Sequence, residues 1–401
     1  MDLVFDIETD GLDATCIHCI VAIDETDKVY SFFSDKIIEG VNFLQQADKL
    51  IGHNIIGFDI PIIKKLTGID LYTPTKVIDT LVMSRLFKPS REGGHSLESW
   101  GYRLGFPKAK QPEWSTFTHQ MLSYCIVDVK LNKKLLSALE KEAVGFSTES
   151  VLLEHEVTHI LTEQKENGFL FNMKEATLLA SKLSRLLKET VDEVHKTFKP
   201  KWVDDKEVTP KKKKDGNLSK QGLTNQEYSD ILEGVRPFKP FMRQHLKEFN
   251  LGSRKQIGEY LQDFGWKPRE LTPTGLPKID ESTLKDITHI YEAKLIADFL
   301  LYQKRIAQIQ SWIEAVSKDE RVHGSVISTG AITGRMAHRN PNMAQVPNTS
   351  SPYGSECRSC WIVDKGNKLV GVDASGLELR MLAHYMNDTG YTNEIINGDI
   401  H

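Results

Sequence analysis

The chain lacks the sequence features of membrane, secreted and disulfide-rich proteins. Its 401 residues contain no run of about 18 apolar residues, so no segment is predicted to cross a membrane. Residues 1–6 are acidic and strand-like, with neither a basic region nor a cleavage site, which argues against secretion. The five cysteines are few and odd in number, and this excludes a disulfide framework.

Four of the cysteines form two Cys-x-x-Cys pairs, Cys16 with Cys19 and Cys357 with Cys360. Such pairs can hold zinc, but structural zinc sites usually place both pairs within a few dozen residues of each other. Here more than three hundred residues separate the pairs, and Cys19 opens an apolar run. The pattern favours buried, reduced thiols, with a zinc site as the alternative.

A strong excess of charge of either sign is also missing. The net charge of −4 argues neither for nor against nucleic acid, because a metal-dependent nuclease gathers acids in its site and basic residues along its groove. The hydrophobic content of 40% and charged content of 26% are those of a globular protein. The length allows two or three domains.

The first part of the chain alternates strand and helix patterns. Short apolar or β-branched runs bounded by turn residues predict strands at 3–6, 19–23, 28–33 and 50–52. Apolar residues at helical spacing predict helices at 58–66, 80–87 and about 118–142. This alternation predicts an α/β domain over residues 1–147, with a central sheet flanked by helices.

The pattern becomes helical near residue 148. Helices are predicted at 148–167, 174–198, 253–264 and 283–316, around a basic insertion at about 198–252. The lysine run at 211–214 and its surroundings, residues 199–222, are most simply a solvated loop. From residue 319 the pattern changes again, with strands predicted at 323–328 and 368–373 and a helix at 376–386. The Gly/Pro/Asn-rich stretch 330–353 between them is a long loop of the kind that often carries function.

Five side chains in the first domain form a pattern that indicates chemistry. Asp6 and Glu8 lie two apart on a predicted strand, so both leave the same face. Asp59 follows a loop where a helix begins, and Tyr124 and Asp128 are at positions i and i+4 of a helix. Each motif alone is common on protein surfaces, but the three together in this order argue against accident.

Four carboxylates from three elements would repel one another without cations between them. Two divalent ions would offset this repulsion and supply a mechanism for phosphodiester hydrolysis. Oxygen ligands favour Mg²⁺ or Mn²⁺ over zinc. Tyr124, whose ordinary pKa is near 10, is expected to orient the attacking water by a hydrogen bond. The pattern predicts a two-metal site for phosphodiester hydrolysis with Asp6, Glu8, Asp59 and Asp128 as metal ligands.

These segments resemble the three exonuclease motifs of the DEDDy family. The matching residues are Phe5-Asp6-Ile7-Glu8, His53-Asn54 with Phe58-Asp59, and Tyr124 with Asp128. The resemblance implies an RNase H-like mixed sheet, four acids that bind two metal ions, a tyrosine that positions water, and a frayed DNA 3′ end as substrate.

A second resemblance lies near the end of the sequence. Residues 369–373 predict a buried strand that ends in Asp373, and Gly376 eases the turn into a helix. The segment Val-Asp-Ala-Ser-Gly-Leu-Glu-Leu-Arg at 372–380 resembles motif A of family A DNA polymerases. The resemblance implies that Asp373 and the carbonyl of Ala374 bind catalytic Mg²⁺. It also implies that Glu378 lies against the sugar of the incoming nucleotide.

Segments on both sides of motif A extend this resemblance. Residues 333–335 and 340–347 resemble the DNA-contacting segment of the family, which implies DNA contacts for Thr333, Arg335, Asn342 and Gln345. Arg335 fits a phosphate or minor-groove contact, and Gln345 can read a minor-groove acceptor. His401 is implied to face the triphosphate of the incoming dNTP.

The likeness to family A polymerases of the T-odd phage type extends in order over nearly the whole chain. It implies an exonuclease domain at 1–147, a helical thumb at 148–318, and the beginning of an α+β palm at 319–401. It also implies a phage protein that acts on primer-template DNA and single-stranded 3′ ends in the cytoplasm of a bacterial host. In that type a thumb insertion captures host thioredoxin, and the insertion here looks shorter.

The sequence stops before the later palm motif and the fingers helix of that family. Asp373 then lacks the second palm carboxylate, so this chain alone is not expected to extend a primer. The sequence is either truncated or part of a split polymerase completed by a separate C-terminal chain, and we favour the split.

The leading hypothesis is therefore a phage replicative DNA polymerase, N-terminal part, with a proofreading exonuclease. One alternative is a DNA-holding scaffold, half of a split polymerase with little activity alone. Another is a standalone DEDDy exonuclease that processes RNA, which would have no use for the motif A and DNA-contacting segments.

Overall fold

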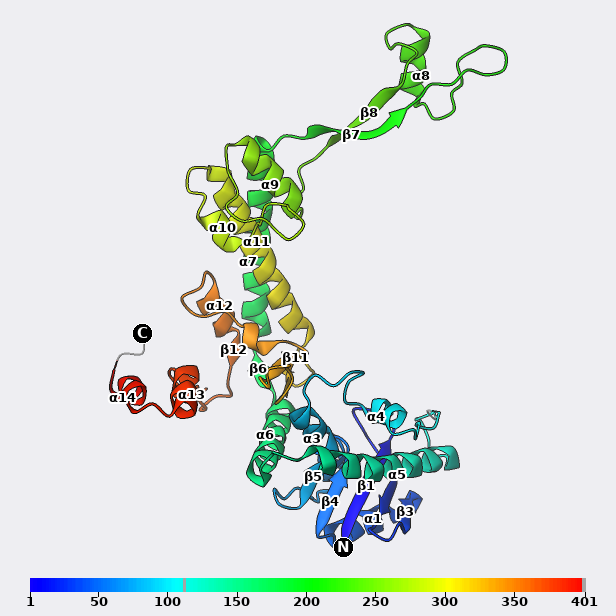
Figure 1. The fold of residues 1–401 in the computed structure, drawn as a ribbon, viewed down its shortest axis with the longest axis vertical. Coiled ribbons are helices and arrows are strands. Elements are labelled where there is room, and N and C mark those ends of the chain that lie inside the picture. Colours follow the sequence, from blue (N-terminus) through cyan, green and yellow to red (C-terminus); the bar gives the residue numbers. More distant parts are fainter. Residues whose placement is uncertain (111–112, 399–401) are drawn as a thin grey trace. The chain divides into compact units, whose positions relative to one another are not determined.

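The computed structural model describes residues 1–110 and 113–398, which divide into two compact units (Figure 1). The first unit contains Met1–Asn172, Val316–Asn340 and Ser359–His401. The second contains Met173–Ala315 and Pro341–Arg358. Separate clusters of buried apolar side chains form a core in each unit.

A five-stranded mixed sheet forms the centre of the N-terminal part. Its strands are β1 (Asp2–Thr9), β2 (Ile17–Ile23), β3 (Val29–Phe33), β4 (Lys49–Gly52) and β5 (Val77–Asp79). Their order is β3-β2-β1-β4-β5; β1 pairs antiparallel with β2 and parallel with β4. The four predicted strands and the α/β fold class are confirmed. Strand β5, only three residues long, was not predicted because so short a run carries no periodic signal.

Helices pack on both faces of this sheet (Figure 1). They are α1 (Ile37–Gln45), preceded by the 3-10 helix η1 (Ser34–Lys36), α2 (Asp59–Thr67), α3 (Thr80–Phe87), α4 (Leu97–Arg103), α5 (His119–Glu142) and α6 (Thr148–Asn167). The helices predicted at 58–66, 80–87, 118–142 and 148–167 are confirmed, whereas α1 and α4 were not predicted.

The alternation of side chains along β1 assigns each face of the strand to a different helix layer. Leu3, Phe5 and Ile7 belong to the core that contains α1 and α2. Val4 belongs to the core on the other face, where α5 packs. Because successive side chains of a strand point to opposite faces, Asp6 and Glu8 are directed to the α5 side.

A three-stranded sheet follows α6 in the same unit. Strand β6 (Phe169–Phe171) lies between β9 (Arg321–Val322) and β12 (Trp361–Ile362), antiparallel to both. Strands β10 (Ser325–Ile327) and β11 (Ala337–Arg339) form a separate antiparallel pair. The strand predicted at 323–328 is therefore present in shorter form, as β10.

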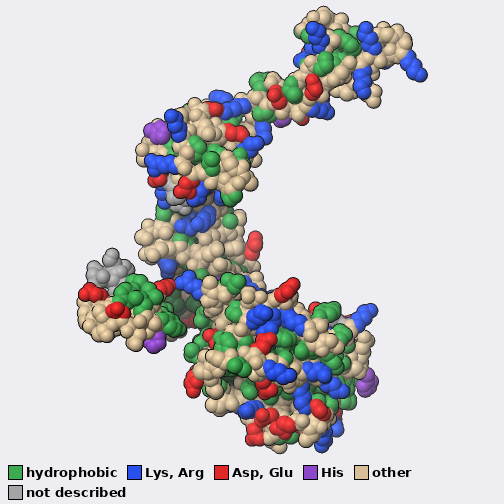
Figure 2. Space-filling view, viewed as in Figure 1, with side chains coloured by type: hydrophobic (Ala, Val, Ile, Leu, Met, Phe, Trp, Pro, Cys, Tyr) green, Lys and Arg blue, Asp and Glu red, His purple; other side chains and the backbone are tan. Residues whose placement is uncertain are grey.

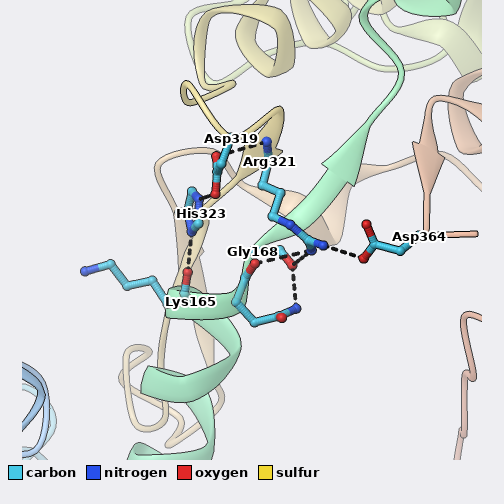
Figure 3. Close-up of polar contacts among 7 residues, drawn as sticks. Lys165, Gly168, Asp319, Arg321, His323 and Asp364 are labelled. Carbon is cyan, nitrogen blue, oxygen red and sulfur yellow. Dashed lines mark hydrogen bonds and ion pairs between the residues drawn. The ribbon is translucent and has the colours of Figure 1, made fainter. Parts of the chain in front are cut away.

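Side chains near β9 cap the C-terminal end of α6 (Figure 3). The Arg321 guanidinium donates hydrogen bonds to the carbonyls of Asn167 and Gly168, and a ring nitrogen of His323 contacts the carbonyl of Lys165. These carbonyls lack partners within the helix, and cationic donors satisfy them well. The contacts fix β9 against the end of α6.

The second unit is mainly helical. Its helices are α7 (Met173–Thr197), α9 (Arg254–Asp263), α10 (Glu281–Lys285), α11 (Tyr291–Glu314), η2 (Met343–Gln345) and α12 (Gly354–Ser359). Helices α7 and α11 pack side by side (Figure 1). The helices predicted at 174–198 and 253–264 are confirmed. The helical pattern predicted over 283–316 is present mainly as α11. It is interrupted at residues 286–290, Asp-Ile-Thr-His-Ile, which have low helix propensity and separate α10 from α11.

The basic insertion is a β-hairpin, not only a solvated loop. Strand β7 (Lys201–Val208) pairs antiparallel with β8 (Phe241–Lys247), and α8 (Asn225–Leu232) lies between them in sequence. The prediction of loop for 199–222 was wrong for β7, because its alternation of apolar and charged residues needs β8 as a partner. The lysines at 211–214 are exposed outside the strands. Lys and Arg side chains gather at the end of the hairpin that lies away from its base at Lys201 and Lys247 (Figure 2).

The strand predicted at 368–373 does not form. These residues have no regular secondary structure, and Leu369, Val370 and Val372 are exposed. A strand needs a neighbour for its backbone hydrogen bonds, and the residues that the structure describes provide none beside this segment. The helix predicted after it is confirmed as α13 (Leu377–Met386), which is followed by α14 (Thr389–Asn397). Within the described ranges, no helix is long and apolar enough to cross a lipid bilayer.

Candidate active site

Strand β1 directs two carboxyl groups toward α5. Oδ2 of Asp6 lies 3.7 Å from Sγ of Cys125, and each of Asp6, Glu8 and Cys125 has a ligand atom within 4.8 Å of the others. Glu8 is buried, with 7% of its surface exposed. The half-buried Asp6 and the buried Glu8 therefore lie between sheet and helix, where a charge needs a partner.

The first residue of α2 brings a third carboxyl group to this place. Oδ1 of Asp59 accepts a hydrogen bond of 3.1 Å from the backbone N–H of Ile7, the residue between Asp6 and Glu8. Asp59 is 3% exposed. Its position in the first turn of α2 also favours a negative side chain, because the helix dipole is positive there.

The loop that carries Asp59 is held by Asp79 at the end of β5. The Asp79 carboxylate accepts hydrogen bonds from the backbone N–H groups of Asn54 (2.9 Å), Ile56 (3.1 Å) and Leu81 (2.9 Å). Asn54 has a φ of 70°, a left-handed conformation that asparagine tolerates better than most residues. One buried acid thus orders the loop before α2 and caps α3.

Helix α5 supplies Tyr124 and Asp128 from one face. The helix begins where Thr118 accepts a hydrogen bond from the N–H of Met121 at 3.1 Å. Tyr124 is 5% exposed and Asp128 is 4% exposed. Nζ of Lys108 lies 2.5 Å from Oδ2 of Asp128 and 4.8 Å from the centroid of the Tyr124 ring. The Lys108 ammonium group thus contacts both candidate site residues of α5.

Burial raises the pKa values of all four acids, and repulsion within the group adds to this for Asp6 and Glu8. Burial is the largest cause for each. It raises the pKa of Glu8 to about 9 and that of Asp59 to about 7. The pKa of Asp6 is well above its ordinary value, because the Asp59, Glu8 and Asp128 charges add to the effect of burial. Burial also raises the pKa of Asp128, against the opposing influence of Lys108. The four carboxylates, called the acid cluster below, therefore share one electrostatic environment.

The acid cluster fits hard divalent cations. Oε1 of Glu8 and Oδ1 of Asp128 are buried, and within the described residues neither has a hydrogen-bond partner. A buried carboxylate oxygen without a partner is costly unless a cation meets it. Carboxylate oxygens are the ligands that Mg²⁺ and Mn²⁺ prefer.

All five cysteines are free thiols, four of them buried. Cys19 and Cys125 lie in the core between β2 and α5. Burial raises the pKa of the Cys125 thiol well above its ordinary value. The thiol nearest the acid cluster is thus kept in its neutral form.

The candidate polymerase residues near the C-terminal end of the chain are exposed to solvent. Asp373, Ala374 and Glu378 are exposed, and Glu378 pairs with Arg335 through an Nη2–Oε1 distance of 2.9 Å. Arg335 is the expected DNA contact and Glu378 the expected nucleotide contact, and both belong to the first unit. His401 lies outside the described residues.

The other expected DNA contacts are exposed as well. Thr333 lies in a turn before Arg335. Gly334 completes this turn with a φ of 76°. Asn342 accepts a hydrogen bond of 3.2 Å from the N–H of Ala344 and so begins η2. The carbonyl of Gln345 accepts a hydrogen bond from the Gln308 side chain, and this leaves the side chain of Gln345 exposed.

Two residues of the site were not found from the sequence. Asp79 precedes a helical run and so carries a cap signal, although nothing local links it to the Asp59 loop. Lys108 lies in a segment without periodicity, and no sequence signal points to it.

The model of the family "DNA polymerase family A" matches residues 229–401. The DNA-directed DNA polymerases of Enterobacteria phage T3 and of Escherichia phage T7 are each 31% identical to the chain, over 100% of it and 72% of each relative. DNA polymerase I of Helicobacter pylori is 34% identical over 38% of this chain and 17% of its own.

A solved structure shows the same fold. The POL domain of Pol1 from M. smegmatis, in complex with DNA primer-template and dNTP, matches with a TM-score of 0.70 and 15% sequence identity. The match covers 100% of this chain and 62% of that one. The phage enzymes match over the whole of this chain, and the family model matches its C-terminal part. The predicted family is therefore confirmed: the chain belongs to DNA polymerase family A.

Proposed function

We propose that the N-terminal part, residues 1–147, is a 3′–5′ exonuclease that removes nucleotides from a DNA 3′ end. Asp6, Glu8, Asp59 and Asp128 would hold two Mg²⁺ or Mn²⁺ ions. The observation that carries this proposal is the acid cluster itself. Its carboxylates come from β1, α2 and α5, and one buried oxygen each of Glu8 and Asp128 has no hydrogen-bond partner among the described residues.

The chain's own groups have distinct tasks in this proposal. The hydrogen bond from the Ile7 N–H holds Asp59 against β1, so the cluster keeps its shape before substrate arrives. Tyr124, fixed by the edge of Trp114 at a centroid distance of 5.7 Å, orients the attacking water through its hydroxyl. When bound, the divalent ions supply charge neutralisation at the scissile phosphate and lower the pKa of water.

The test is release of mononucleotides from 3′-labelled single-stranded DNA with Mg²⁺. Wild-type chain should release them, and the double variant Asp6→Ala plus Glu8→Ala should not. The matched control is Asp35→Ala plus Glu39→Ala, which removes two exposed acids from η1 and α1 of the same domain. Equal release by the wild type and the Asp6/Glu8 variant would reject the exonuclease.

We further propose that residues 148–318 form a thumb and residues 319–401 part of a polymerase palm. Asp373 and the Ala374 carbonyl would hold Mg²⁺, Glu378 would contact a dNTP, and Arg335 would contact DNA. The family supports this, as does the primer-template and dNTP bound to the M. smegmatis neighbour. Synthesis would need a second carboxylate beside Asp373, from the same polypeptide or from a separate C-terminal chain.

The β7–β8 hairpin is the proposed place for a processivity partner such as a host thioredoxin. Trp202 and Leu246, directly opposite each other across the strands, are 66% and 52% exposed, and Met242 is also exposed. Exposed apolar side chains of this size are typical of protein-binding surfaces. A pull-down of thioredoxin by the wild type, lost in Trp202→Ala plus Leu246→Ala, would support this partner.

A DNA-holding scaffold with slow nuclease activity is the second candidate. It is favoured by one observation, the ion pair of Lys108 with Asp128, which engages an expected metal ligand. Tight DNA binding without mononucleotide release in the assay above would support the scaffold.

A further inference from the structure

Lys108 lies inside the site although no motif contains it. Its side chain is only 20% exposed, and Nζ is 2.5 Å from Oδ2 of Asp128. The ammonium also lies 4.8 Å from the centroid of the Tyr124 ring, within the range of a cation–π contact.

The segment that carries Lys108 is attached to the domain at both ends. The N–H of Phe106 donates to the carbonyl of Gly101 at 2.9 Å. Farther along, the carbonyl of Trp114 lies 3.0 Å from Nε2 of His18. These contacts lie on either side of Lys108 in the sequence, so its position between α4 and α5 follows from the fold.

A buried ammonium needs negative neighbours, because leaving water is costly for a charge. The acid cluster provides them, because Asp128 contacts Lys108 directly and the positive charge of Lys108 also acts on Asp6 and Glu8. In this respect Lys108 supplies part of the positive charge that the cluster requires. The Lys108 ammonium group occupies the side of Asp128 Oδ2 that it contacts, so a metal ion cannot bind Oδ2 from that side at the same time.

We propose that Lys108 is an internal counter-ion that stabilises the acid cluster before metal binds and competes with metal for Asp128. Lys108 is then a positioning residue whose departure from Asp128 accompanies metal loading. The proposal rests on the proposed function only in that the cluster binds divalent metal.

Removal of the charge should have two opposite effects. Lys108→Met keeps an apolar stem over Tyr124 but deletes the competitor, so the Kd for Mn²⁺ should fall by about tenfold or more. The same change leaves the carboxylates without a counter-charge, so the midpoint of thermal unfolding in EDTA should decrease. Lys108→Arg keeps the charge and should resemble the wild type in both measurements.

The experiment titrates the full chain with Mn²⁺ and follows free Mn²⁺ by electron paramagnetic resonance. Thermal unfolding in EDTA is followed by circular dichroism. Lys110→Met, an exposed lysine on the same segment, is the matched control. Lys108→Gln serves as a second neutral variant should Lys108→Met fail to fold.

Tighter Mn²⁺ binding and lower metal-free stability in the neutral Lys108 variants, but not in Lys110→Met, would support the proposal. Unchanged or weaker Mn²⁺ binding in the neutral variants would overturn it. Nucleotide release by the wild type is measured separately. A chain that binds Mn²⁺ in this competitive way without releasing nucleotides would reject the exonuclease and keep the counter-ion.

Discussion

At the scale of single residues, the site consists of carboxyl groups whose charged form is disfavoured by burial. Glu8, Asp59 and Asp128 are almost fully buried, and burial raises the pKa of each. The proposed divalent ions would account for their place in a core, because a bound cation would offset both desolvation and repulsion.

The first prediction concerns pH and metal-free stability. Because the folded chain holds protons on Glu8 up to a pKa of about 9 and on Asp59 up to about 7, it binds more protons than the unfolded chain above about pH 4.5. The free energy of unfolding should therefore decrease as pH rises from about 5 to 9 in EDTA. Thermal unfolding across this range measures it.

The control is Asp6→Asn plus Glu8→Gln, which removes two of the titrating charges without changing side-chain size. The loss of stability with rising pH should be smaller in this variant, and Mn²⁺ should no longer stabilise it at pH 8. A pH dependence identical to that of the wild type would contradict the argument.

The second prediction separates Tyr124 from the metal ligands. Tyr124→Phe removes only the hydroxyl, so metal affinity should be kept while nucleotide release slows by about tenfold to a hundredfold. Single-turnover release and Mn²⁺ titration give the two quantities. Loss of Mn²⁺ affinity in this variant would show that the tyrosine supports the metals and not the water.

At the scale of elements, the site is assembled by the ends of strands and helices. β1 presents two acids to α5, the start of α2 adds a third, and Asp79 at the end of β5 holds the loop between β4 and α2. His155 of α6 accepts the N–H of Asp79 at 2.8 Å, so α6 supports the same junction. The acids are therefore carried by β1, α2 and α5 and supported by β5 and α6, five elements that are separate in the sequence.

The third prediction follows from that junction. Asp79→Ala leaves three backbone N–H groups without their acceptor, which should cost about 3 kcal/mol of stability and slow nucleotide release. Chemical unfolding of the N-terminal domain within the full chain measures the first effect. Asp79→Asn keeps one acceptor oxygen and should lose less; equal stability of the alanine variant and the wild type would refute the role.

At the scale of the whole molecule, the chain consists of two units with separate cores. The proposed exonuclease site lies entirely in the first, whereas the β7–β8 hairpin with its basic end belongs to the second. Cα partners Lys201 and Lys247 close the base of the hairpin. The hairpin can therefore be shortened at its base without opening either core.

The fourth prediction uses this separation. Replacing residues 202–246 by a short Gly-Ser turn should leave nucleotide release from short single-stranded DNA unchanged. If the basic end of the hairpin contacts phosphates, affinity for long DNA should fall and depend less steeply on salt. Fluorescence anisotropy at several salt concentrations measures this, and a loss of release from short DNA would contradict independence of the site.

Local sequence patterns predicted much of the fold. Helices such as α3 and α6 matched their predicted ends because each has its own apolar spacing and cap. The resemblance of the exonuclease and motif A segments led to the family that the comparisons show. The missed features include the short strand β5, the partner-dependent β7–β8 pair, helices α1 and α4, and the break between α10 and α11.

The sequence alone determined which acids share a face of β1 and which residues of α5 stack, because these relations depend only on the repeat of a strand or helix. Tertiary structure decided which groups contact these acids. Asp79 accepts hydrogen bonds from the loop before Asp59, and Lys108 forms an ion pair with Asp128. The tertiary structure also left 368–373 without the strand that its apolar residues predict. The physical reason is common to all three, since a buried charge and a strand edge are both completed by groups from distant parts of the chain.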